Sequence, residues 1–371
     1  MRDLLIKTFT RLVTTPSPTG HESAVAAVVR EYLTDLGLAV SSDDAHLHSP
    51  AECGNLYAFL PATAPGYPVM MLNAHLDTVT HAGPIVPVLE GDVIRSEGDT
   101  ILGADDKAGI ALILLALRTL LEDASPHGDL WIVFTVAEET GLWGARLLDY
   151  DRLSPWPQLA LVLDGGRQPG KMTIAAPSAV SLDVTFTGCA AHAGVCPEQG
   201  VSAIQAAAEA IAGMRLGRLD AETTANVGMI EGGSARNVVP EVCRLQAEAR
   251  SHNEEKLAAQ VAHLREQLES AAAHYNARVE VDVDQSYQAF HLAPDSLPVV
   301  RAGAAAAQLG IEPVREIGGG GSDANVFNER GIPALMFATG AAEVHTPQET
   351  LNVPAALRCL EWLLATITRA D

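Results

Sequence analysis

The sequence predicts an α/β protein with a mainly parallel sheet flanked by helices and with an inserted α+β domain. Three observations predict this fold class. Apolar runs typical of buried strands alternate with helical patterns through residues 1–177. The pattern changes near Ser178, where strands of alternating polarity and two helices follow. The first pattern returns from Ser296 onward and ends in a helix over 354–368.

The first part of the chain supplies the elements of the predicted parallel sheet. We expect helices at 1–13 and 22–37, the second opening after Thr19-Gly20-His21. Strands are expected at 54–60, 69–75 and 88–95, followed by a helix at 106–122, a strand at 130–136, a helix at 143–149 and a strand at 159–163. This alternation favours parallel strands covered by helices.

The segment 178–290 has the pattern of a self-contained α+β unit. Residues 180–186 and 245–250 alternate between apolar and polar side chains, which is typical of half-exposed strands. Further strands are expected at 225–230 and 278–284, and helices at 202–215 and 253–274. We therefore divide the chain into one domain made of 1–177 and 291–371 and an inserted domain made of 178–290.

Charge and composition exclude several classes of partner. The formal net charge of −22 argues against nucleic-acid and anionic-membrane partners, since both need basic patches. The longest apolar run, Ile110 to Leu117, is too short to span a bilayer. The five cysteines form no disulfide framework, and the N-terminus has the pattern of an amphipathic helix rather than a signal peptide. We expect a reduced cytoplasmic protein.

Two neighbouring carboxylates, Glu138 and Glu139, follow the apolar run 130–136. An isolated carboxylate is costly to desolvate, and a pair repels. A bound cation is the simplest remedy, because one carboxylate can ligate it while the other stays free as a base.

Other metal-ligating side chains follow other predicted strands. His75 and Asp77 come after the apolar run 69–72 and point to the same side of an extended segment, so Asp77 can orient the His75 ring. Asp105 and Asp106 precede the helical stretch 110–121, where carboxylates are favoured; one of the two could also bridge two metals.

A further aspartate and a distant histidine complete the candidate set of metal ligands. Asp164 ends the third apolar run, and His345 lies in a loop before the last helix. Sites in open α/β sheets form outside the carboxyl ends of the strands. The oxygen and nitrogen ligands suit zinc, cobalt or manganese: His75, Asp105, Glu139, Asp164 and His345. Two ions bridged by Asp105 would use all five and leave Glu138 free beside a metal-bound water.

Five segments in this order resemble the co-catalytic di-zinc metallopeptidases, a family that includes peptidase T, glutamate-type carboxypeptidases, aminoacylases and desuccinylases. They span most of the chain: 75–79, 103–109, 137–141, 163–165 and 344–347. The resemblance implies a zinc-exopeptidase-like catalytic domain that binds two metal ions. It also implies that 178–290 is a lid and dimerisation domain, with a homodimer formed through the edge of its sheet.

The resemblance implies a role for each residue of the candidate set. His75 and Asp164 would hold one zinc, Glu139 and His345 the other, and Asp105 would bridge them. Glu138 would be the general base, and Asp77 would support His75. Peptidase members of the family tend to carry Asp at the place of Asp164, whereas deacylase members tend to carry Glu, which favours a peptidase.

Candidate substrate contacts come from other segments of the chain. His192, within 190–194, resembles the family histidine that reaches the partner subunit's active site and stabilises an oxyanion. Asn237 resembles a substrate-binding asparagine, and Arg250 can pair with a substrate carboxylate. The loop 318–323 contributes Gly320 and Ser322, because glycine permits close backbone approach. The alternatives are turn residues for the first two and a surface charge for the arginine.

The function that these observations favour is a metal-dependent aminopeptidase or dipeptidase for short peptides, similar to peptidase T. The alternatives are a carboxypeptidase, an N-acyl amino acid deacylase, or a catalytically silent metal-binding protein on the same scaffold. No ligand or base position is missing from the sequence, which argues against the silent protein. The peptide, the end from which it is cut and the metal are left open.

Overall fold

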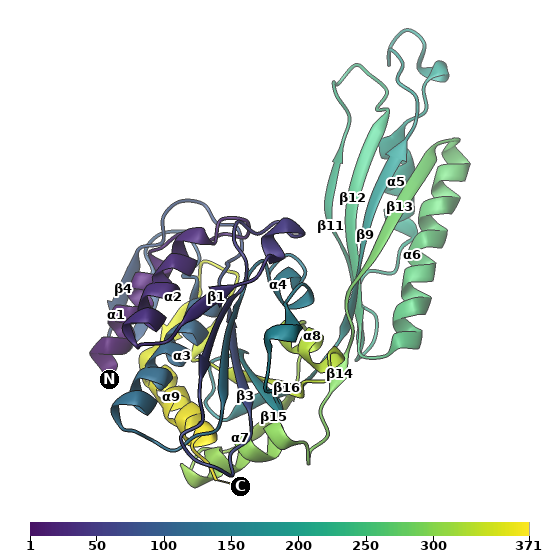
Figure 1. Cartoon of the computed structure of the whole chain (residues 1–371). Coiled ribbons are helices and arrows are strands. Elements are labelled where there is room, and N and C mark those ends of the chain that lie inside the picture. The colour runs from purple at the N-terminus through teal and green to yellow at the C-terminus, as the bar shows by residue number, and fades with distance from the viewer. Residues whose placement is uncertain (371) are drawn as a thin grey trace. The chain divides into compact units, whose positions relative to one another are not determined.

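The computed structural model describes residues 1–370, which form two compact units (Figure 1). The larger unit comprises Met1–Ala175, His291–Gly318 and the chain from Ser322 onward. The smaller unit comprises Ala176–Phe290 together with Gly319–Gly321. The predicted fold class is confirmed, because a largely parallel central sheet with helices is joined by a separate antiparallel sheet.

The larger unit is built on one mixed sheet whose central pairs are parallel. The strand order is β1 (Val40–Ser42), β2 (Leu56–Leu60), β6 (Leu130–Thr135), β3 (Met70–His75), β7 (Leu159–Gly165), β16 (Ala334–Ala338), β8 (Lys171–Ala176) and β14 (Phe290–His291), with β15 (Val314–Ile317) paired to β8. The pairs β6–β3, β3–β7 and β7–β16 are parallel. Strands β6 and β3 are buried along their whole length, which explains their continuous apolar runs.

Helices cover this sheet and pack on one another (Figure 1). They are α1 (Arg2–Val13), α2 (Ser23–Asp35), α3 (Ala104–Glu122), α4 (Trp143–Arg146), α7 (Leu297–Gln308), α8 (Asp323–Glu329) and α9 (Val353–Ile367). Helix α3 contacts both β3 and β7, as well as α1 and α9. It is therefore apolar on nearly all sides and buries Ile110 through Leu117.

A small antiparallel sheet corrects one sequence prediction. Its order is β17 (Ala341–Ala342), β18 (Thr350–Asn352), β5 (Val93–Ser96) and β4 (Pro87–Glu90). The prediction of a single strand over 88–95 is wrong, because β4 and β5 pair as a hairpin with Glu90 opposite Val93. Gly91, between them, has a φ of 63°, a left-handed conformation that favours glycine and reverses the chain. The predicted helix 143–149 is likewise shorter and ends at Arg146.

The smaller unit is an antiparallel sheet with two helices on one face (Figure 1). Its strand order is β10 (Gly217–Arg218), β11 (Thr223–Gly232), β12 (Val242–Ser251), β9 (Ser178–Thr187) and β13 (Arg278–Tyr287). Helices α5 (Ala203–Gly213) and α6 (Glu254–Tyr275) pack against it. Alternate residues of β9, such as Leu182, Val184 and Phe186, enter the core, as the period-two pattern requires.

Two further observations concern the whole described chain. Within residues 1–370, each helix falls short of the length or the apolar character needed to cross a membrane. All five cysteines are unpaired: Cys53, Cys189, Cys196, Cys243 and Cys359.

Candidate active site

The candidate site begins where three neighbouring parallel strands end. His75 is the last residue of β3 and lies opposite Thr135, the last residue of β6. Asp164 lies near the end of β7, the strand on the other side of β3. Because the strands are parallel, their carboxyl ends meet at one edge of the sheet. This edge therefore brings together side chains that are far apart in the sequence.

Asp77 holds the two strand ends together. Its Oδ1 accepts a hydrogen bond from the Glu138 amide at 2.9 Å, and its Oδ2 accepts from the Glu139 amide at 3.2 Å and from the Thr19 hydroxyl at 2.7 Å. The His75 Nδ1 atom lies 3.4 Å from Asp77 Oδ1 and 3.1 Å from the Asp77 carbonyl oxygen. Burial opposes the charge, but His75 and these donors keep the pKa of Asp77 below its ordinary value.

Asp105 lies between the two candidate histidines. Its Oδ1 is 2.9 Å from His75 Nε2, and its Oδ2 is 3.2 Å from His345 Nε2. The backbone of Asp105 and Asp106 is non-helical, so these residues form an irregular turn before the regular part of α3. A carboxylate with one oxygen toward each imidazole has the arrangement that a bridging ligand needs.

The side chain of Glu139 lies in an environment that a bound cation would stabilise. Its Oε1 is buried and has no hydrogen-bond partner of good geometry, although His345 Nε2 lies 3.1 Å away. Ligand atoms of His75, Asp105 and Glu139 all lie within 4.8 Å of one another. A buried carboxylate oxygen without a donor is costly, so the residues present fit a divalent ion at this point.

A second group of ligand atoms lies beside the first. Atoms of His75, Asp106 and Asp164 also lie within 4.8 Å of one another. Asp106, however, accepts hydrogen bonds from the His75 amide at 3.2 Å and from the Gly109 amide at 3.1 Å. Its carboxylate is thus already occupied in holding β3 to the start of α3, which leaves Asp164 as the free carboxylate of this group.

The electrostatics of the site show a surplus of buried negative charge. Burial and the neighbouring Glu139 raise the pKa of Glu138 well above its ordinary value. Burial and Asp105 likewise raise the pKa of Asp164. The nearby carboxylates of Asp105 and Glu139 raise the pKa of His345 to about 10. Two divalent cations would balance these charges, and two imidazoles with three carboxylates are a donor set that suits them.

Sequence reasoning assigned no role to a buried lysine behind the site. The Lys107 ammonium donates to the Leu76 carbonyl at 2.6 Å and lies 3.4 Å from the Asp77 carbonyl. Burial lowers the pKa of Lys107 to about 8, against the attraction of Asp77 and Asp106. The sequence signal for this role was the position of Lys107 directly after the aspartate pair, since a buried acidic cluster needs a positive charge nearby.

The candidate substrate residues of the smaller unit fall into two places. His192 forms an isolated bridge with Val238, and the Ala193 amide donates to the Asn237 carbonyl at 3.0 Å, so His192 and Asn237 lie in paired, exposed loops. Arg250 pairs with Glu248 at 2.9 Å, and a Cβ atom added to Gly320 would lie 3.7 Å from Arg250 Nη1. The structure thus brings Gly320 next to Arg250 and Asn237 next to His192.

Ser322 lies in the larger unit and is fully buried. Its hydroxyl oxygen accepts a hydrogen bond from the Ala324 amide at 3.2 Å, and its own amide donates to the Asn325 side chain at 3.0 Å. These bonds form a capping box at the start of α8. The hydroxyl is therefore engaged in capping, and a contact of Ser322 with substrate stays a prediction.

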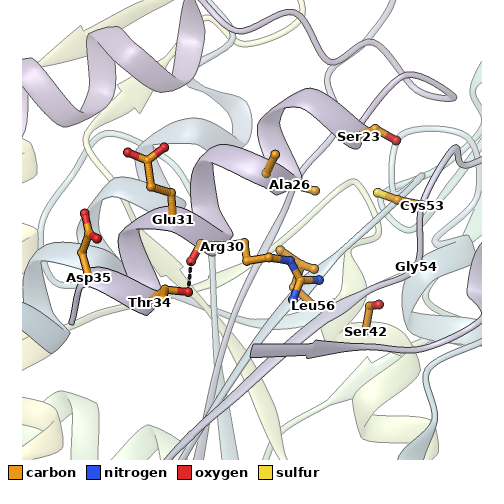
Figure 2. A pocket seen from close by; sticks show the side chains of 11 residues that line it. Ser23, Ala26, Arg30, Glu31, Thr34, Asp35, Ser42, Cys53, Gly54 and Leu56 are labelled. Atoms are coloured by element: carbon orange, nitrogen blue, oxygen red, sulfur yellow. Dashed lines mark hydrogen bonds between the residues drawn. The ribbon is translucent and has the colours of Figure 1, made fainter. Parts of the chain in front are cut away.

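Two hollows of the larger unit differ in their relation to the site. A hollow of about 80 Å³ is lined by Asp105, Asp106 and Asp164, among other residues. A wider one of about 470 Å³ lies along α2, beside Cys53 and Arg30, and includes none of the candidate ligands (Figure 2). The Arg30 guanidinium there donates to the Val40 carbonyl at 2.8 Å, so the arginine is engaged in holding α2 to β1.

Comparisons with known proteins agree with this geometry. A peptidase dimerisation domain matches residues 174–276, and a model of peptidase family M28 matches residues 55–164. Protein YqjE of Bacillus subtilis is 38% identical over 366 residues, which cover 99% of this chain and 98% of that protein. Peptidase T of Aeromonas salmonicida is 28% identical over 98% of each chain.

Solved structures extend the likeness to the whole chain. The aminopeptidase PepT of Bacillus cereus is 40% identical with a TM-score of 0.84, covering 99% of this chain and 98% of that one. A tripeptidase of Staphylococcus aureus is 36% identical with a TM-score of 0.89 and the same coverage. The fold and the relatives define a metallopeptidase, a hydrolase of peptide bonds. The chain belongs to the co-catalytic metallopeptidases, in their peptidase T-like branch, which confirms the resemblance given above.

Proposed function

We propose that the protein is a metal-dependent aminopeptidase that cleaves tripeptides or dipeptides with a free N-terminus. One observation carries the proposal. Ligand atoms of His75, Asp105 and Glu139 converge within 4.8 Å, and Glu138 follows the same strand, β6, as Glu139. The relatives named as an aminopeptidase and a tripeptidase, each similar over 99% of this chain, support the substrate class.

Two divalent ions, Zn²⁺ with Co²⁺ or Mn²⁺ as alternatives, would be held by the five candidate ligands. His75 and Asp164 would hold one ion, Glu139 and His345 the other, and Asp105 both. When bound, such ions supply Lewis acidity that makes water a stronger acid and polarises a carbonyl group. The unpaired buried oxygen of Glu139 and the surplus of carboxylates support this assignment.

Glu138 is proposed as the general base. Its side chain is only 9% exposed, and its amide is fixed by Asp77 at 2.9 Å. It would take a proton from the attacking water and pass that proton to the leaving amine. Burial and Glu139 raise the pKa of its carboxyl above the ordinary value.

The smaller unit is proposed as a lid and dimerisation domain. The matched dimerisation domain over residues 174–276 supports a homodimer. In it, His192 would serve the active site of the partner subunit by donating a hydrogen bond to the developing oxyanion. Asn237, Gly320 and Ser322 would position the peptide, and Arg250 would bind its carboxylate. Unpaired cysteines support a reducing, cytoplasmic location.

The test combines metal content with a substrate panel. Free dipeptides and tripeptides, N-blocked peptides and N-acetyl amino acids are offered to the metal-loaded enzyme with and without chelator. We expect chelator-sensitive cleavage only of peptides with free N-termini. Cleavage confined to N-acylated substrates would instead favour the alternatives, a carboxypeptidase or an N-acyl amino acid deacylase.

The Glu138→Gln variant tests the base. We expect it to bind the same number of ions as the wild type and to lose about 10³-fold or more in kcat, because the amide cannot accept the proton. Glu97→Gln is the matched control, since Glu97 is exposed and outside the site. Retained turnover in Glu138→Gln would overturn the assignment.

A further inference from the structure

Glu349 joins two segments of the larger unit that are far apart in the chain. It is 1% exposed and lies four residues after His345. Its Oε2 accepts hydrogen bonds from the Leu102 amide at 2.8 Å and the Gly103 amide at 2.7 Å, and its Oε1 accepts from the Asp105 amide at 3.0 Å. A single buried carboxylate therefore satisfies three backbone donors at the turn that carries Asp105.

The side chains of the turn itself do not accept hydrogen bonds from these backbone amides. Gly103 stands at the N-cap of α3 with a φ of 70° and has no side chain with which to cap the helix. Asp105 cannot cap it either, because its oxygens face His75 and His345. The Glu349 side chain, which comes from a distant segment, thus caps the turn. These hydrogen bonds also fix the backbone from which the Asp105 carboxylate projects.

The other end of the link is the loop that carries His345. Glu343 and His345 have φ values of 55° and 63°, which are unfavourable for residues with a side chain. The Thr346 hydroxyl donates to the Glu343 carbonyl at 2.7 Å, and the Glu349 amide donates to the Thr346 carbonyl at 3.1 Å. The loop is closed on itself and is attached to the Asp105 turn through the Glu349 side chain.

We propose that Glu349 is a positioning residue that sets the distance between the Asp105 carboxylate and the His345 imidazole. Both of its oxygens are occupied by backbone donors, and it belongs to neither group of ligand atoms, so it acts through the ligands and not on a metal. The inference rests on the proposed di-metal function. The Glu349 side chain would act most strongly on the ion at Glu139 and His345, because it holds both the Asp105 turn and the His345 loop, and less on the ion at His75 and Asp164, which it reaches through Asp105 alone.

The test is stepwise titration of the metal-free protein with Zn²⁺ in a calorimeter. In Glu349→Gln the volume is kept, but the side-chain NH₂ group faces backbone donors and one link is broken. We expect one of the two binding steps to weaken by about 10–100-fold, the usual effect of losing a partner that orients a ligand. The other step should weaken less, because it depends on Glu349 through Asp105 alone.

Glu343→Gln is the matched control, because Glu343 lies in the same loop with an exposed side chain. Equal weakening of both steps, or no weakening, in Glu349→Gln would overturn the proposal. Glu349→Asp serves as a second variant, and failure of both variants to fold would assign Glu349 to general stability and also overturn it. If the wild type itself binds fewer than two ions, the proposed function fails and not the positioning role alone.

Discussion

The candidate site of the larger unit and the substrate loops of the smaller unit place their polar side chains in opposite ways. In the larger unit, His75, Asp77 and Glu138 are buried at the ends of parallel strands and are held by several neighbours. In the smaller unit, His192 and Asn237 stand in exposed loops, and the ion pairs lie at the surface. Buried charges are costly unless they are compensated, whereas exposed ones change the free energy of unfolding little.

The difference teaches where each kind of function can reside. Ligands that are buried and fixed, such as His75, are suited to bind ions in a defined geometry, because little has to rearrange on binding. The exposed His192 ring accepts a hydrogen bond from the Gly194 amide at 3.2 Å and is otherwise accessible to a substrate or a partner subunit. Substitutions of the buried site residues should therefore alter metal binding and stability. Substitution of His192 should alter turnover alone.

The largest effect expected from the comparison is that of His192→Ala. We expect kcat for a free tripeptide to fall by about 10²–10³-fold, as when one oxyanion donor is removed. Because His192 is exposed, the metal content and the melting temperature should stay as in the wild type. His274→Ala, an exposed histidine on α6 that pairs with Glu209, is the control. Full activity in His192→Ala would make His192 a turn residue.

Asp323 offers a test of the buried side of the comparison. It is 2% exposed, accepts a hydrogen bond from the Thr135 hydroxyl, and has a buried Oδ1 without a partner. Burial raises the pKa of Asp323 to about 6 from an ordinary value of 3.8. The charged form is thus disfavoured in the folded state, so its cost is absent below about pH 4 and is fully present above about pH 6.

Asp323→Asn should remove that cost in the metal-free protein. The unfolding free energy of the variant, measured with urea in the presence of chelator, should exceed that of the wild type by on the order of 2–3 kcal/mol at pH 8. The advantage should vanish as the pH falls from about 6 to about 4. Asp295→Asn, at an exposed position of the same unit, should show no such trend. A pH-independent difference for Asp323→Asn would contradict the expectation.

The smallest effect is expected at the surface of the smaller unit. Lys256 pairs with Asp220 at 3.0 Å and with Glu222 at 2.8 Å, and all three side chains are more than 40% exposed. Lys256→Ala should change the unfolding free energy only slightly, and 1 M salt should reduce the difference further. A larger loss that persists in salt would show that surface charges of this unit matter as much as buried ones.

The sequence predicted the parts of the fold that follow from periodicity. The apolar runs 69–75, 130–136 and 159–163 became β3, β6 and β7, because buried parallel strands need continuous apolar sequence. The convergence of His75, Glu139 and Asp164 followed from the shared edge at which parallel strands end. The hairpin of β4 and β5 was missed, although Glu90-Gly91-Asp92 interrupts the apolar residues with a glycine-containing turn signal.

Contacts that depend on the path of loops were beyond sequence reasoning. Nothing local marks Glu349 as the cap of a helix that begins 245 positions earlier, at Ala104. The capping role of Ser322 was also not predicted, although a serine three residues before Asn325 is a recognisable helix start. The roles of the ligands and of Glu138 stay predictions until ions and turnover are measured.

The carboxylate of Asp77 has a consequence for how such an enzyme can change its range of substrates. It faces His75 and binds the amides of both Glu138 and Glu139, so one side chain sets the spacing between the candidate base and the candidate ligands. Because the candidate base Glu138 and the candidate ligands His75 and Glu139 are held by Asp77, a shift of one would shift the others. New specificity would then have to arise in segments that Asp77 does not touch, while the chemistry stays the same.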